Sequence, residues 1–185
     1  EIVLKWLELE KERPPFKVVA TEYELTTEIA SLPIKLKLDR IDQLENNNLL
    51  LIDYKTGKVN LQEWFGERPE SPQLPIYVAY CETLINQFSG CDIEGLSFAR
   101  LHYEELGFKG LSNMETGIKG IQVFKPEKFS SSSTDFVSQK EQWKIQFEKL
   151  ATDFLEGRAM LDPRDNVETC QKCELHMLCR VYETE

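Results

Sequence analysis

The sequence lacks long hydrophobic runs and a recognisable start. Its 185 residues contain no run of about 18 consecutive apolar positions, the length that predicts a transmembrane helix. The chain begins at Glu1 rather than methionine, inside a helical pattern, and shows no secretory signal. We therefore expect no membrane partner. We also expect a cytoplasmic piece of a longer protein, truncated at the N-terminus, where a signal would be hidden.

Positive charge is also scarce. Acidic residues number 32 and basic residues 22, which gives a net charge of −10 at pH 7. Domains that bind nucleic acids are usually basic, so this balance argues against such a partner. The argument is weak, because whole-chain charge says little about one cleft and acids that bind a cation add to the deficit. Nucleic acid therefore stays among the candidate partners.

Cysteines are few and odd in number. Cys81 and Cys91 lie apart in mid-chain, whereas the other three cluster near the end, at Cys170, Cys173 and Cys179. An odd count without signs of secretion favours a metal or cluster site over a disulfide framework.

Apolar periodicity and turn residues predict an α/β sandwich around a mixed sheet. The apolar run at 49–55 is typical of a central strand covered on both faces. The expected helices are residues 1–13, 71–88 and 135–156, and the expected strands are 17–29, 34–43, 49–55, 93–104 and, more weakly, 117–124.

Two of the predicted helices have marked ends. Ser71 is the expected cap of the second helix, with Pro72 in its first turn. The third helix follows a flexible or capping stretch at 130–134 and ends at Gly157. Its expected buried face consists of Trp143, Phe147, Leu150 and Phe154.

The stretch "LLLIDYKTGK" at 49–58 ends a buried strand with an aspartate and a lysine. A three-residue loop at 45–47 would pair Leu44 with Asn48, which places Asp39 opposite Asp53. Facing residues have Cβ atoms about 4.5–5.5 Å apart, so two carboxylates would repel unless a proton or cation separates them. Lys55 shares this face. The pattern predicts a divalent-metal site.

Alternatives to each of these assignments stay open. Asp42 is the rival of Asp39, but an odd spacing turns it to the other face unless a bulge intervenes. An Asp-x-Lys pair is commonly a solvated salt bridge. Gln73 and Tyr77 share one helix face and can hydrogen-bond toward the sheet, although Tyr77 could be core and Gln73 surface.

Three motifs in order resemble those of the PD-(D/E)XK nuclease superfamily, in its RecB-like branch. They are "LDRID" at 38–42, "IDYKTG" at 52–57 and "QLPIY" at 73–77. The likeness is closest to AddB-type nuclease domains of predicted bacterial DNA-repair proteins. It implies a restriction-endonuclease-like core at 1–165, with a mixed sheet flanked by helices, and a cysteine tail at 166–185.

The resemblance implies roles for the motif residues. Asp39, Asp53 and the Tyr54 carbonyl would bind Mg²⁺ or Mn²⁺, and Lys55 would position or activate the attacking water. The reaction would be metal-assisted hydrolysis of phosphodiester bonds.

Two further motif residues, and two departures from the family pattern, complete the comparison. Gln73 and Tyr77 would orient the lysine or the DNA backbone. Leu36 stands where the family usually has glycine, and neither His102 nor His176 matches an upstream metal-binding histidine. Glu22 and Glu28 could add a carboxylate, although we expect them to be ordinary exposed strand residues.

The tail "CQKCELHMLCR" at 170–180 has the spacing C-x2-C-x5-C. His176 could complete a Cys₃His zinc site. The resemblance instead implies a structural [4Fe–4S] cluster on Cys170, Cys173 and Cys179, with a fourth cysteine upstream of residue 1. We expect Cys81 to be a buried apolar residue, and Cys91 is a weaker alternative ligand.

The sequence thus predicts the nuclease domain of a DNA-repair or recombination protein. It would act on single-stranded ends, as an exonuclease rather than an endonuclease, beside a helicase subunit or helicase-like domain. The first alternative is an inactive nuclease fold that binds DNA or acts as a scaffold. The second is a zinc-binding interaction module.

Overall fold

Six strands form one sheet in the described part of the chain, in the order β1 to β6. Pairs β1–β2, β2–β3 and β4–β5 are antiparallel, and pairs β3–β4 and β5–β6 are parallel, so the sheet is mixed as predicted. The computed structural model describes residues 1–80, 88, 90–129, 131–158, 160–165 and 167–179. The strands are β1 Phe16–Ile29, β2 Leu32–Leu44, β3 Leu49–Lys55, β4 Ile93–Arg100, β5 Gly107–Ser112 and β6 Ile121–Val123.

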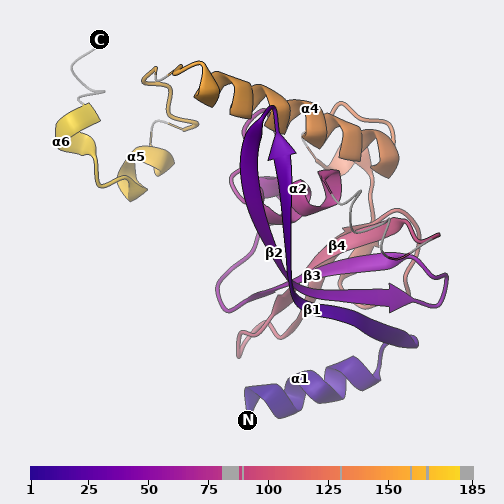
Figure 1. Cartoon of the computed structure of the whole chain (residues 1–185). Coiled ribbons are helices and arrows are strands. Elements are labelled where there is room, and N and C mark those ends of the chain that lie inside the picture. The colour runs from indigo at the N-terminus through magenta and orange to yellow at the C-terminus, as the bar shows by residue number, and fades with distance from the viewer. Residues whose placement is uncertain (81–87, 89, 130, 159, 166, 180–185) are drawn as a thin grey trace.

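Helices cover both faces of this sheet. Figure 1 shows α1 on one side and α2 with α4 on the other, while α5 and α6 lie beyond the C-terminal end of α4. The helices are α1 Ile2–Lys11, α2 Gln73–Ala79, α4 Phe136–Leu155, α5 Glu168–Lys172 and α6 His176–Cys179, with short 3₁₀ turns at η1 Leu61–Trp64 and η2 Pro126–Lys128. The predicted fold class, a mixed sheet flanked by helices, is confirmed.

The core is split by the sheet, and β3 contributes to both halves. Leu49 and Leu51 pack with α2 and α4 in the larger cluster, whereas Leu50 and Ile52 pack with Trp6 of α1 in the smaller one. All four β3 side chains are fully buried. The unbroken apolar run is therefore that of a strand covered on both faces, as predicted.

The β1–β2 hairpin is longer than the sheet body and rises toward α4 (Figure 1). Its apolar residues, Leu25, Ile29, Leu36 and Leu38, extend the larger core onto that arm. A register shift lies in β1, between Val18 and Ala20, rather than in β2. A bulge in β2 could have turned Asp42 to the face of Asp39 and Asp53, but the irregularity lies on the neighbouring strand.

Strand β5 was not predicted, because its glycines weaken the strand pattern. Gly110 faces Ser97 of β4, and a Cβ at this glycine would lie 2.4 Å from the Leu96 carbonyl oxygen. The two backbones approach too closely for any side chain there, which is one reason for glycine inside a strand. The predicted strand at 93–104 ends earlier, at Arg100, and the one at 117–124 shortens to β6.

The prediction for α4 needs two corrections, one at its N-terminal cap and one on its buried face. Its cap is Asp135, which accepts a bond from the Ser138 N–H and forms a capping box, and not the serines before it. Gly157 follows the end with φ of +70°, as predicted. Phe154, expected on the buried face, is 71% exposed, because the last turn of the helix extends beyond the core.

Helix α2 also differs at its start. Pro72 occupies the cap position without a side-chain bond, and Ser71 instead donates its hydroxyl hydrogen to Glu63. The expected continuation to residue 88, with Cys81 in it, falls on 81–87, which lie outside the described residues. Among the described residues no helix is long and apolar enough to cross a membrane.

Candidate active site

Asp39 and Asp53, the acid pair, face each other across β2 and β3, as the predicted register requires. The β2–β3 ladder pairs Arg40 with Ile52 and Ile41 with Leu51, and this register puts Asp39 across from Asp53 at the next step. The Tyr54 backbone N–H donates to Asp39 Oδ2 at 2.9 Å, which holds that carboxylate against β3. The predicted hairpin register is confirmed.

Asp53 is the buried member of this pair, and its negative charge is costly there. The residue is only 2% exposed, and burial raises the pKa of this carboxyl. The Lys55 ammonium, 2.8 Å from Asp53 Oδ2, opposes that rise, while the negative charge of Asp39 adds to it. The contact with Lys55 is an ion pair without the direction of a hydrogen bond, so the buried oxygen has no hydrogen-bond donor among the described residues.

This arrangement fits a divalent cation. Two carboxylates face each other, one of them buried with an oxygen that no hydrogen bond satisfies. The oxygens of Asp39 and Asp53, with the Tyr54 carbonyl beside them on the chain, are ligands of the kind that Mg²⁺ and Mn²⁺ prefer. A cation between the acids would offset both their repulsion and the burial of Asp53.

A line of hydrogen bonds connects the lysine to helix α2 and back to β2. Lys55 Nζ donates to Gln73 Oε1 at 3.3 Å, and Gln73 Nε2 donates to Tyr77 Oη at 2.9 Å. Tyr77 Oη donates in turn to the Lys37 carbonyl at 2.5 Å, two residues before Asp39. Tyr77 packs in the core, as the alternative supposed, but its hydroxyl and the Gln73 amide also join this line of hydrogen bonds.

Asp42 lies on the opposite face of the sheet. It is fully buried and pairs with Arg40 Nε at 2.6 Å and with Arg13 Nη2 at 2.9 Å. Arg40 also contacts Glu10 of α1 at 2.7 Å and the Tyr54 hydroxyl at 3.1 Å. This buried ion cluster fastens α1 to β2, which leaves Asp39 as the aspartate of the acid pair.

The other candidate acids do not join the pair. Glu22 and Glu28 are exposed on β1, and Glu22 forms an ion pair with Lys37. They are the ordinary exposed strand residues that we expected.

Two basic residues on this face escaped the sequence analysis. The β3–β4 ladder pairs Lys55 with Arg100, and the β4–β5 ladder places Lys109 beside Phe98, the neighbour of Asp53. Lys109 Nζ donates to the Val59 carbonyl at 2.8 Å and so holds the loop that follows the acid-lysine motif. Strand parity alone could have put Arg100 and Phe98 on one face, but only the pairing of β3 with β4 brings that face to Lys55.

The cysteine tail packs against the loop that leads to α2. Arg164 and Lys172 both pair with Glu70, at 2.5 and 3.2 Å, and these cations lower the pKa of that carboxyl, Lys172 most strongly. Cys170 is buried, and the Leu175 N–H donates to Cys173 Sγ at 3.4 Å.

The tail cysteines are not gathered into a ligand group. Across the described residues, no three His, Cys, Asp or Glu side chains are close enough together to hold a metal ion. The side chain of His176 lies outside the described residues. Cys91, the alternative ligand, is buried in the larger core and accepts a bond from Gln43 Nε2 at 3.4 Å, as a structural cysteine would.

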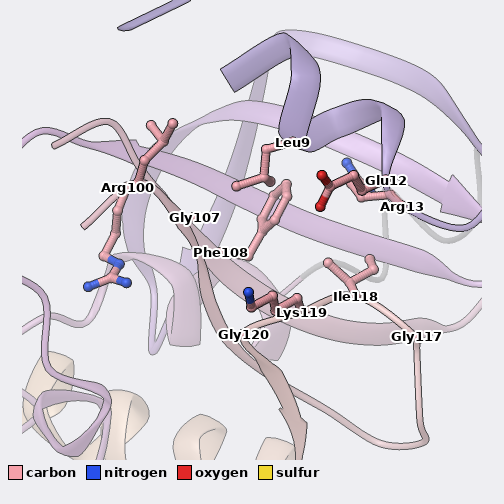
Figure 2. Close-up of a pocket in the computed structure, with 11 residues that line it drawn as sticks. Leu9, Glu12, Arg13, Arg100, Gly107, Phe108, Gly117, Ile118, Lys119 and Gly120 are labelled. Carbon is pink, nitrogen blue, oxygen red and sulfur yellow. The ribbon is translucent and has the colours of Figure 1, made fainter. Parts of the chain in front are cut away.

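A hollow of about 280 Å³ lies on the other side of the sheet, between α1 and strands β5 and β6. Figure 2 shows Leu9, Glu12 and Arg13 on one wall, with Phe108 and Ile118 facing them. None of the predicted acids, nor Lys55, lines it. The acid pair and its lysine are therefore separate from this hollow.

Comparison with known proteins agrees with this geometry. No curated protein matches the chain. A family model described as the PD-(D/E)XK nuclease superfamily matches residues 1–180, from the first helix through the cysteine tail, and so includes all three motifs. Proteins of this superfamily are generally phosphodiesterase nucleases. The chain belongs to the PD-(D/E)XK nuclease superfamily.

Proposed function

We propose that this domain is a metal-dependent deoxyribonuclease. The observation that carries the proposal is the line of contacts from Asp53 through Lys55, Gln73 and Tyr77 to the backbone of β2. It fixes an ammonium group beside two facing carboxylates at the end of a buried strand. Metal-assisted hydrolysis of a phosphodiester uses those parts: anionic ligands for a cation and a positioned donor near the attacked phosphorus.

Each residue has a role that follows from its place. Asp39, Asp53 and the Tyr54 carbonyl would hold Mg²⁺ or Mn²⁺, which when bound lowers the pKa of a water molecule and offsets charge on the phosphate. The Lys55 side chain is 39% exposed, so its ammonium can donate to the attacking water or to a phosphate oxygen while still contacting Asp53. The buried acid keeps the lysine aimed at the site.

Gln73 and Tyr77 act as positioning residues. Gln73 accepts from Lys55 and donates to Tyr77, so it limits the rotamers that the lysine can adopt. Tyr77 fixes this amide and also anchors α2 to the strand that carries Asp39. The lysine and the acid pair therefore share one rigid support, which is what accurate placement of a reacting group requires.

The biological setting that we propose rests on the RecB-like character of the three motifs. The domain would digest single-stranded DNA ends as an exonuclease in a bacterial repair or recombination protein. A helicase subunit, or a helicase-like domain of the same protein, would supply those ends. We also propose a cytoplasmic location, where such a repair protein would act.

For the tail, residues 166–185, we propose a structural [4Fe–4S] cluster appended to a nuclease core at 1–165. Cys170, Cys173 and Cys179 would supply three of its four thiolates. The N–H of Leu175 that points at Cys173 Sγ supports this, since such bonds stabilise a thiolate ligand. Zinc bound by the same cysteines is the alternative, and it predicts zinc without iron or labile sulfide.

The test is cleavage of end-labelled single-stranded and duplex DNA with Mg²⁺, Mn²⁺ or EDTA. The parent protein should cut only with a metal, and Lys55→Ala and Asp53→Asn should abolish cleavage. Lys149→Ala, an exposed lysine of α4, is the matched control and should cut normally. A folded, metal-supplied protein that cuts neither substrate would instead favour a DNA-binding or scaffold domain.

A further inference from the structure

Arg100 stands beside the catalytic lysine although no motif includes it. It ends β4 and is the ladder partner of Lys55, and the Leu101 N–H donates to the Lys55 carbonyl at 2.8 Å. Neighbouring strands lie about 4.8 Å apart and paired residues point to the same face. Arg100 lines the hollow on the α1 side, but Figure 2 shows its guanidinium directed away from Leu9 and Glu12 on the opposite wall.

The guanidinium is only partly satisfied in its present surroundings. Nη1 pairs with Glu105 Oε2 at 2.6 Å, but Nε is buried and has no hydrogen-bond acceptor among the described residues. The Arg100 side chain is 18% exposed, so this unmatched donor sits at the edge of the site rather than in open water. A buried donor without a partner is costly, so an anionic acceptor that reaches this nitrogen would be favourable.

An incoming anion could displace Glu105 from its ion pair with Arg100. It lies in the short connection between β4 and β5, its side chain is 53% exposed, and Arg100 is its one charged contact among the described residues. An exposed ion pair of this kind contributes little to stability, so an incoming anion can replace it at small cost.

We propose that Arg100 binds a phosphate of the DNA strand next to the scissile bond, and that Glu105 occupies its guanidinium when DNA is absent. The proposal rests on the proposed nuclease function. A guanidinium presents Nε and Nη as a planar fork that matches two phosphate oxygens. The Glu105 carboxylate stands in for those oxygens, and bound DNA would also satisfy the unmatched Nε.

The measurement is equilibrium binding of a fluorescent single-stranded oligonucleotide in EDTA, where no cleavage occurs, at several salt concentrations. Arg100→Gln should weaken binding about tenfold. It should also reduce the magnitude of the salt slope by about 0.7, the value for one phosphate contact on a single strand. Arg158→Gln is the control, because it removes an ion-paired arginine beyond the end of α4, and it should change neither quantity.

Glu105→Gln is the second test variant. It changes an exposed side chain, so the substitution should not affect folding. Removal of the competing carboxylate should tighten binding about two- to fivefold. A purely structural Arg100–Glu105 pair predicts instead that this variant binds as the parent does. Circular dichroism and thermal midpoints establish that each variant is folded. If Arg100→Gln does not fold, Glu105→Gln and Arg100→Lys test the proposal instead. Arg100→Lys should weaken DNA binding, but by less than about tenfold.

Unchanged affinity and salt slope in folded Arg100→Gln, or unchanged affinity in Glu105→Gln, overturns the inference, as does a parent protein that binds no DNA. These results are separable from the nuclease proposal. Metal-dependent cleavage with binding indifferent to Arg100 would remove only the inference. Binding that depends on Arg100, without cleavage under any metal, would remove only the proposed catalysis.

Discussion

Tyr77 Oη donates a hydrogen bond to the Lys37 carbonyl at 2.5 Å, and this bond joins helix α2 to the strand that carries Asp39. The same hydroxyl accepts from Gln73, whose other end holds Lys55. One phenol thus connects the two halves of the site, the acid on β2 and the lysine on β3.

Tyr77→Phe should therefore reduce activity more than stability. The lost hydrogen bond costs about 1 kcal/mol in the free energy of unfolding, whereas the freed Gln73 no longer fixes Lys55, and kcat should fall about tenfold or more. Tyr80→Phe is the matched control, because Tyr80 donates to the Lys144 carbonyl away from the site. Equal kcat values for the two variants would show that the line of contacts is only structural.

The raised pKa of Asp53 gives the metal-free protein a specific dependence on pH. Because the folded state holds the proton more tightly than the unfolded state, it binds more protons between the two pKa values. The contribution of Asp53 to stability should therefore fall as pH rises from the ordinary value of about 4 through the raised one. Asp53→Asn should lose less stability over that window, as thermal midpoints in EDTA would show.

Divalent metal should reverse this trend. A cation favours the ionised carboxylates, so Mg²⁺ or Mn²⁺ should raise the thermal midpoint of the parent protein, and more so at pH 8 than at pH 5. Asp39→Asn and Asp53→Asn should both lose the increase while keeping the fold. A metal-induced increase of the same size in Asp53→Asn would place the cation elsewhere.

The hairpin and its acid pair could be predicted because they are local. A three-residue turn fixes the register of β2 against β3, and the alternation of β2 assigns Asp39 and Asp42 to opposite faces. Gln73 and Tyr77 are separated by one helical turn, so their shared face also follows from the sequence.

Features that depend on distant pairing could not be found in this way. Arg100 reaches Lys55 only because β4 lies parallel to β3, with a helix between them in the chain. Strand β5 was not predicted because Gly107 and Gly110 weaken its pattern, and the close backbone contact at Gly110 cannot be read from composition. Arg13, which pairs with Asp42, follows α1 about thirty residues earlier in the chain, and Glu10 of α1 joins through Arg40, so the ion cluster around Asp42 could not be inferred from the sequence.

That ion cluster predicts different outcomes for the two aspartates of "LDRID". Asp42→Asn leaves Arg13 and Arg40 buried without their shared carboxylate, and the free energy of unfolding should fall by about 3–5 kcal/mol. Asp39→Asn should keep the stability and lose cleavage. Urea denaturation and cleavage assays on both variants separate these effects, and a stable but inactive Asp42→Asn beside an active Asp39→Asn would contradict our assignment of the acid pair.

The cysteine tail offers the last prediction, which concerns stability rather than chemistry. Lys172 of the tail contacts Glu70 in the loop before α2, and Figure 1 shows α5 and α6 away from strand β3, so a cluster there would stabilise the chain without taking part in the reaction. Cys173→Ala should lower iron and sulfide content and the thermal midpoint, while activity per folded molecule changes little. Cys91→Ala, which alters a core cysteine, should keep its iron. Zinc without iron in the parent protein would exclude the cluster. A thermal midpoint of Cys173→Ala equal to that of the cluster-loaded parent protein would show that the cluster does not stabilise the fold.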